Sequence, residues 1–144
     1  MLANSYARTY QTQAIMTASP GLLVLMLYDG ALRFLAQAHA ALEDQSESPR
    51  RIETIHSNLQ KAQNIIAELQ AVIDHKAGGD VAANLDQLYD YYSRRLLEAN
   101  LKKDLAPVVE VERLLRELRN AWAEMLHQTE GSASAPTAGM RSVA

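Results

Sequence analysis

The sequence contains no cysteine. That absence excludes disulfide frameworks, thiolate metal sites and thiol catalysis together, and it fits a reducing compartment. An excess of one charge is also missing, since 14 lysines and arginines stand against 17 aspartates and glutamates, for a net charge of -3. This balance gives no electrostatic case for binding nucleic acid or an anionic membrane.

The first residues lack the basic start and apolar run of a signal peptide. No segment reaches the roughly 20 apolar residues that a bilayer-crossing helix needs. What the chain has is the length of one domain, 144 residues of which 48% are hydrophobic, enough for a substantial single core. We therefore expect a cytoplasmic protein with no nucleic acid partner and no stable membrane insertion.

The most informative stretch opens the first long helix. Ser19 can cap this helix by accepting a hydrogen bond from a free backbone N–H, and Pro20 suits the first helical position, where a missing N–H costs nothing. Six of the seven residues that follow Gly21 are large and apolar, and the seventh is Tyr28. A helix without a polar face is buried on several sides, or it waits for something to cover it.

Apolar periodicity predicts four helices. The first runs from about Pro20 to Glu43, and its apolar residues at helical spacing are Leu23, Met26, Leu27, Gly30, Phe34, Ala38 and Ala41. The second begins at Ser48-Pro49 and carries a heptad seam, typical of near-parallel helix packing, formed by Ile52, Ile55, Leu59, Ala62, Ile66, Leu69 and Ile73.

Glycines and aspartates mark the later boundaries. Gly78-Gly79 is expected to end the second helix, with Asp80 capping a third helix that ends near Asn100. Asp104 is expected to cap the fourth. The outer face of that fourth helix carries charged pairs four residues apart, typical of a solvated surface: Glu112 with Arg116 and Arg113 with Glu117.

Short connections make sequential helices antiparallel. We therefore predict an all-α fold, an antiparallel up-down-up-down four-helix bundle over residues 18–128. An N-terminal capping segment, residues 1–17, precedes the bundle. A disordered C-terminal tail, residues 129–144, follows it, because this stretch is rich in serine, alanine and glycine and has no helical stripe.

The N-terminal segment sets a few large side chains among small and polar ones. This pattern suggests a segment that docks through three anchors, Tyr6, Tyr10 and Ile15. The alternative is a flexible N-terminus without a docking site.

Catalytic and metal chemistry find little support. Glu-x-x-His, which di-metal four-helix bundles use in pairs, occurs at Glu53–His56 and Glu124–His127. The first motif lies at the start of the second helix, and the other lies at the end of the fourth helix, which should run parallel to the second. The two motifs therefore lie roughly 25–30 Å apart along the bundle. The remaining histidines, which have no ligand partner at useful spacing, are His39 and His75. We expect no catalytic, cofactor or metal residue and no enzyme; a metal-dependent bundle enzyme remains the alternative.

Asp29 directly follows the apolar run. It is either a boundary aspartate that reaches solvent, or a partly buried carboxylate that needs an arginine or backbone partner.

The second and third helices carry more apolar and aromatic residues than a bundle core requires. A four-helix bundle uses about three apolar positions in seven, and tyrosine is enriched at interfaces because one end is apolar and the other stays wet. The surplus predicts a groove for a partner helix or extended peptide. The alternative is that these residues only widen the contact with the core. The residues predicted to line the groove are Ile65, Leu69, Val72, Leu85, Leu88, Tyr89 and Tyr92.

Several separated motifs, in order and at consistent spacing, resemble the flagellar secretion chaperone family over roughly residues 6–126. The motifs that carry the resemblance are Tyr10, Thr17-Ala18-Ser19-Pro20 leading to Met26-Leu27-Tyr28-Asp29-Gly30-Ala31, Lys61-Ala62-Gln63-Asn64-Ile65-Ile66, Gly78-Gly79-Asp80 with Asn84-Leu85 and Leu88-Tyr89-Asp90-Tyr91, then Arg94-Arg95-Leu96, Ala99-Asn100 and Trp122.

The resemblance implies a cytoplasmic chaperone without ATPase activity or cofactor. Its expected partner is the C-terminal segment of flagellin, bound 1:1, which it would keep from premature polymerisation and deliver to the flagellar export apparatus for type III secretion. In the family the N-terminal segment lies over part of the binding surface when cargo is absent, which implies a role for Tyr10 and Ile15 as cap anchors. A helical adaptor that binds a different amphipathic partner remains the alternative.

Overall fold

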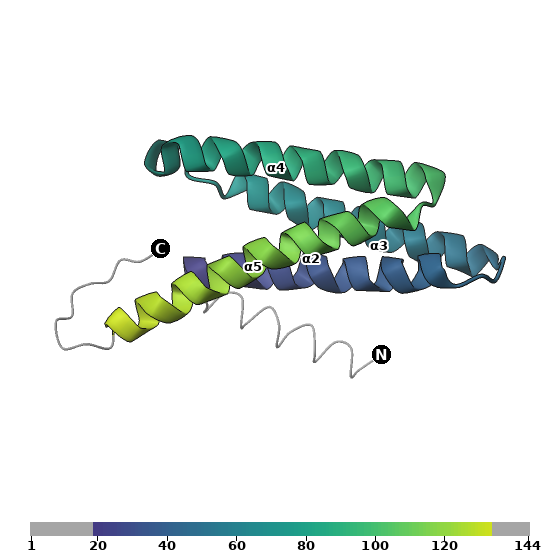
Figure 1. Cartoon of the computed structure of the whole chain (residues 1–144), viewed down its shortest axis with the longest axis horizontal. Coiled ribbons are helices and arrows are strands. Elements are labelled where there is room, and N and C mark those ends of the chain that lie inside the picture. Colours follow the sequence, from purple (N-terminus) through teal and green to yellow (C-terminus); the bar gives the residue numbers. More distant parts are fainter. Residues whose placement is uncertain (1–18, 134–144) are drawn as a thin grey trace, which may run out of the picture.

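The computed structural model describes residues 19–133 of the chain. In this part it forms four helices: α2 (Pro20–Glu43), α3 (Pro49–Ala71), α4 (His75–Lys102) and α5 (Leu105–Ala133). Each helix runs opposite to the one before it, and α2 packs against α3 and α5 while α4 packs against the same two helices (Figure 1). The predicted up-down-up-down bundle is confirmed, and the predicted capping segment at 1–17 lies outside the described residues.

Three of the four helix starts lie where the sequence predicts them. The Ser19 hydroxyl accepts a hydrogen bond from the backbone N–H three residues on, at 3.2 Å, with Pro20 in the first helical position. The Ser48 hydroxyl accepts from the N–H two residues on, at 3.1 Å, ahead of Pro49. The Asp104 carboxylate accepts from the N–H two residues on, at 3.1 Å. Each cap satisfies an N–H that the helix itself leaves without a partner.

The junction between α3 and α4 corrects one prediction. α3 ends at Ala71, well before the glycine pair, and Asp74 rather than Asp80 caps the next helix, which begins at His75. The Asp74 carboxylate accepts hydrogen bonds from the two backbone N–H groups that follow His75, at 3.1 and 3.0 Å. Gly79 leaves the helical conformation, with φ at 53°, so it kinks α4 and separates a short first turn from the long helix that follows, which agrees in part with the break predicted at the glycine pair. An aspartate upstream of the glycines therefore sets the boundary.

The far end of α5 corrects a second prediction. The tail was predicted to begin at residue 129, yet α5 continues to Ala133. The Thr129 hydroxyl donates a hydrogen bond at 2.9 Å to the carbonyl of Met125, four residues earlier. Threonine makes this hydrogen bond when it lies within a helix. Residues 134–144 of the predicted tail lie outside the described residues.

The core is one cluster that draws on all four helices. The seam predicted on α3 is buried from Ile55 to Leu69, whereas Ile52 is 43% exposed at the helix start and Ile73 lies beyond the helix end. The face that α2 buries consists of Gly21, Tyr28, Gly30, Ala31, Leu35, Ala38 and Leu42. This face is rotated from the predicted stripe, so other apolar side chains of α2 remain outside the core.

α2 is also long and apolar enough, by length and composition, to cross a membrane, and it is the one such helix among the described residues. The prediction that no segment is apolar enough to cross a bilayer is therefore wrong for α2. The bundle offers a physical reason for its composition, because α2 packs against both α3 and α5.

A candidate apolar binding cleft

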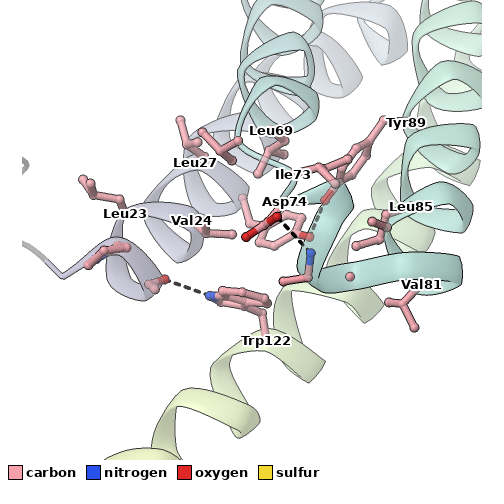
Figure 2. Close-up of a pocket in the computed structure, with 17 residues that line it drawn as sticks. Leu23, Val24, Leu27, Leu69, Ile73, Asp74, Val81, Leu85, Tyr89 and Trp122 are labelled. Carbon is pink, nitrogen blue, oxygen red and sulfur yellow. Dashed lines mark hydrogen bonds between the residues drawn. The ribbon is translucent and has the colours of Figure 1, made fainter. Parts of the chain in front are cut away.

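A cleft of about 470 Å³ opens at the end of the bundle where α2 begins, α3 ends and α4 begins (Figure 2). We call it the apolar cleft. Trp122 of α5 closes one side. Its lining is mainly aliphatic and aromatic: Pro20, Gly21, Leu23, Val24, Leu27, Tyr28, Leu69, Val72, Ile73, Asp74, Ala77, Gly78, Val81, Ala82, Leu85, Tyr89 and Trp122.

The first two turns of α2 form one wall. Leu23, Val24 and Leu27 line the cleft, and each is only partly buried. Leu22 is 42% exposed beside them. A helix segment this apolar normally loses its surface to a partner, since burying such side chains favours association by about 25 cal/mol per Å². The wall therefore has spare apolar surface that the bundle itself does not cover.

Two tyrosine hydroxyls meet at the floor. Tyr28 of α2 and Tyr89 of α4 are hydrogen-bonded oxygen to oxygen at 2.5 Å, and both residues are buried. Burial raises the pKa of both hydroxyls, so they stay neutral across the physiological range. Tyr89 also packs edge to face against Tyr92, with ring centroids 6.2 Å apart. The floor is thus a fixed, uncharged surface.

Trp122 ties α5 to the start of α2. Its indole N–H donates a hydrogen bond to the carbonyl of Gly21 at 2.8 Å (Figure 2). Two turns further along α2, Arg119 Nε donates to Asp29 Oδ1 at 2.8 Å. Both expectations for Asp29 hold in part, because its side chain is 45% exposed and also has an arginine partner. These two contacts fix the α5 side of the cleft.

Four of the seven predicted groove residues lie around the cleft. Val72, at the end of α3, is 56% exposed, and Leu85 of α4 is partly buried. Leu69 and Tyr89 also line the cleft but are each only 2% exposed, so they contribute to its base.

The other three predicted groove residues lie elsewhere. Ile65 packs onto α2 over Gly30, where its δ-carbon lies 3.2 Å from the point a β-carbon would occupy. Leu88 is 38% exposed in a separate hollow on α4, where its neighbours are polar residues such as Asn84 and Arg94. Tyr92 is 1% exposed within the core, and burial raises the pKa of its hydroxyl to about 12. The predicted anchors Tyr6, Tyr10 and Ile15 lie outside the described residues.

Sequence reasoning missed the contribution of α2 and α5 to this cleft. The residues it did not place there include Leu23, Val24, Leu27, Tyr28 and Trp122. The available signal was the apolar run after Gly21, which predicts a covered helix but not which elements share its surface.

The two Glu-x-x-His motifs are exposed at all four positions, Glu53, His56, Glu124 and His127. Among the described residues, no group of three or more histidine, aspartate or glutamate side chains could hold a metal ion. The motifs are therefore surface features of α3 and α5.

His39 has a partner that spacing along the chain did not reveal. Its Nδ1 lies 2.6 Å from Oε1 of Glu112 on α5, and Glu112 is only 8% exposed. The hydrogen bond to Glu112 raises the pKa of His39, and Glu43 adds to the shift. Glu112 is thus an interhelical group, which corrects the prediction of a solvated pair with Arg116. The other predicted surface pair, Arg113–Glu117, is exposed and 3.6 Å apart.

A helical bundle with an apolar cleft at one end is typical of a class of protein, one that binds the apolar face of a partner. Comparison with known sequences assigns the particular family. The family described as "Flagellar protein FliS" matches residues 2–129, and the chain belongs to that family. FliS proteins are chaperones, so the expectation that this chain is not an enzyme is confirmed.

Named relatives cover most of the chain. It is 43% identical to the flagellar secretion chaperone FliS of Salmonella typhimurium (strain LT2) over 84% of this chain and 87% of that protein. It is 38% identical to the protein of the same name in Bacillus subtilis (strain 168), over 87% of this chain and 88% of the relative. The Escherichia coli (strain K12) FliS is also 38% identical, over 85% and 87%.

Proposed function

We propose that this chain binds the C-terminal helical segment of flagellin, in a 1:1 complex in the cytoplasm, until the flagellar export apparatus takes the cargo. Support for a flagellar export substrate as partner comes from membership of the FliS family. Flagellin is the cargo we favour because a filament-forming segment carries apolar stripes that bind copies of itself. Covering those stripes would prevent premature polymerisation.

The single observation that carries the proposal is the uncovered apolar wall of α2 beside the cleft. Leu23, Val24 and Leu27 face a volume of about 470 Å³, which suits side chains from one face of an amphipathic helix. A client that orders as it docks loses conformational entropy, so the complex needs many shallow contacts. We propose that the accessible members of the predicted groove extend this contact surface along α3 and α4: Val72 and Leu85, which line the cleft, and Leu88, which is exposed on α4.

We propose further that residues 1–17 cover this surface when no cargo is bound, with Tyr6, Tyr10 and Ile15 as anchors. Support comes from chain continuity, since the segment leads directly into Pro20 and Gly21, which line the cleft. Tyr10→Ala should raise amide exchange in residues 1–17 without unfolding the bundle. If those residues already exchange freely in the wild-type protein without cargo, this cap does not exist.

The test of the cargo is calorimetry of the full chain with flagellin from the same organism. Binding should saturate at 1:1 with a negative heat-capacity change, because apolar surface is buried. Flagellin that lacks its C-terminal segment should not bind. Undiminished binding of the truncated flagellin would contradict the proposal, and no binding of intact flagellin would favour an adaptor for another amphipathic partner.

A further inference from the structure

The backbone at Gly79 is unusual for a residue inside a helix. Its φ is 53° and its ψ is -126°, in a region that only glycine adopts without strain. Glycine adopts ordinary helical angles as well, so the residue can leave this bend and let α4 run straight. Among residues 19–133, and apart from the adjoining backbone, no heavy atom lies within 4 Å of the position that a β-carbon on Gly79 would occupy. The bend is therefore not forced by crowding at this position.

The segment on the N-terminal side of this bend is held mainly by itself. We call residues 73–79 the lid segment. The Asp74 carboxylate caps its single turn, and the Gly78 N–H donates to the Asp74 carbonyl at 2.8 Å. In the part of the chain that the structure describes, the side-chain hydrogen bonds of residues 74–79 all stay within the segment. Residues 74–77 and Gly79 are exposed, and Ile73 alone packs against the core.

This weakly held segment forms one wall of the apolar cleft. Ile73, Asp74, Ala77 and Gly78 line the cavity. Figure 2 shows Ile73 and Asp74 across the cleft from Leu23 and Val24, with Trp122 beside them. A movement of the turn away from α2 would widen the cleft without disturbing its floor, because Tyr28 and Tyr89 belong to the long helices.

We propose that the lid segment is a hinged lid, with Gly79 as its hinge, that straightens onto the axis of α4 to admit cargo into the cleft. The bent state narrows the cleft of the free protein. The straight state enlarges it to take a helical segment. Admission of cargo rests on the proposed function, whereas movement of the lid does not.

Movement of the lid segment is tested on the free protein by fluorescence resonance energy transfer. The chain has one tryptophan and no cysteine, so Trp122 is a unique donor and Lys76→Cys carries a unique dansyl acceptor on the lid. Gly79→Ala disfavours the bent state by about tenfold or more, because an L-residue is strained at this φ and ψ. Energy transfer should therefore fall. Ala83→Gly, at an exposed position of the same helix, is the matched control and should leave it unchanged.

A second variant guards against misfolding of the first. Asp74→Ala removes the cap of the lid turn and should also reduce energy transfer, by loosening the turn. Unchanged transfer in both variants would overturn the lid, whatever the protein binds. In titrations with flagellin, Gly79→Ala should raise affinity by up to about tenfold, and affinity equal to or below that of the wild type would contradict the role of the lid in admitting cargo.

Discussion

At the scale of single residues, the polar groups that join the helices come in pairs whose members are far apart in sequence. Tyr28 meets Tyr89, and His39 meets Glu112. None of these contacts follows from helical periodicity, because each depends on how two helices are rotated against each other. Sequence patterns identified the helices that carry these groups, but they could not identify the partners.

The Tyr28–Tyr89 pair should show strong coupling. Tyr28→Phe leaves the buried hydroxyl of Tyr89 without its partner and should lower the free energy of unfolding by about 1–3 kcal/mol, and Tyr89→Phe should behave likewise. The double variant should lose clearly less free energy of unfolding than the sum of the two single losses, since no buried hydroxyl is then left unpaired. Urea unfolding of the three variants measures this, and strictly additive losses would contradict it.

His39 should make stability depend on pH. Its pKa is raised in the folded state, chiefly by the hydrogen bond to Glu112. The added stability is therefore fully present below the unfolded pKa, about 6.5, and is lost as pH rises through the raised folded value.

The wild-type protein should have a higher free energy of unfolding than His39→Gln, and this difference should be larger at pH 6 than at pH 9. The change between the two pH values should be no more than about 1 kcal/mol. Thermal unfolding at the two pH values measures the difference. An equal gap at both would show that the charge on His39 does not stabilise the fold.

At the scale of elements, the sequence predicts most where its pattern is unambiguous. The α3 seam has one apolar stripe, and its buried face follows that stripe. α2 is apolar nearly all round, so periodicity could not decide which face enters the core; packing against α3 and α5 decides it. The cleft was only partly predictable for the same reason, because its α2 wall is what remains after the core face is chosen.

The end of α2 is held by a side chain from the next helix. Arg51 donates from Nε to the carbonyl of Ala41 at 2.9 Å and from a terminal guanidinium nitrogen to Leu42 at 3.2 Å. These carbonyls belong to the last turn of α2, where a positive charge is also favoured.

Arg51→Ala should therefore cost about 1–2 kcal/mol of unfolding free energy. Arg50→Ala is the matched control, because Arg50 is exposed and its change should cost less than about 0.5 kcal/mol. Chemical denaturation compares the two, and equal losses would mean that Arg51 does not secure the helix end.

At the scale of the whole molecule, the apolar cleft lies at one end of the bundle. The α2–α3 connection lies at the end where α4 finishes, whereas the cleft lies where α2 and α4 begin (Figure 1). The cleft end carries the uncovered apolar surface to which we propose the client binds.

The most direct test of client binding at the cleft compares two exposed apolar residues on α4. Val81 lines the cleft and is 67% exposed, whereas Leu101 is 77% exposed near the other end of the helix. A glutamate at either position leaves the core intact, but at Val81 it puts a charge into the proposed client interface. Calorimetry with flagellin should show at least about a tenfold loss of affinity for Val81→Glu, and a change within about twofold for Leu101→Glu. Wild-type affinity in Val81→Glu, or an equal loss in both variants, would contradict the cleft as the site of client binding.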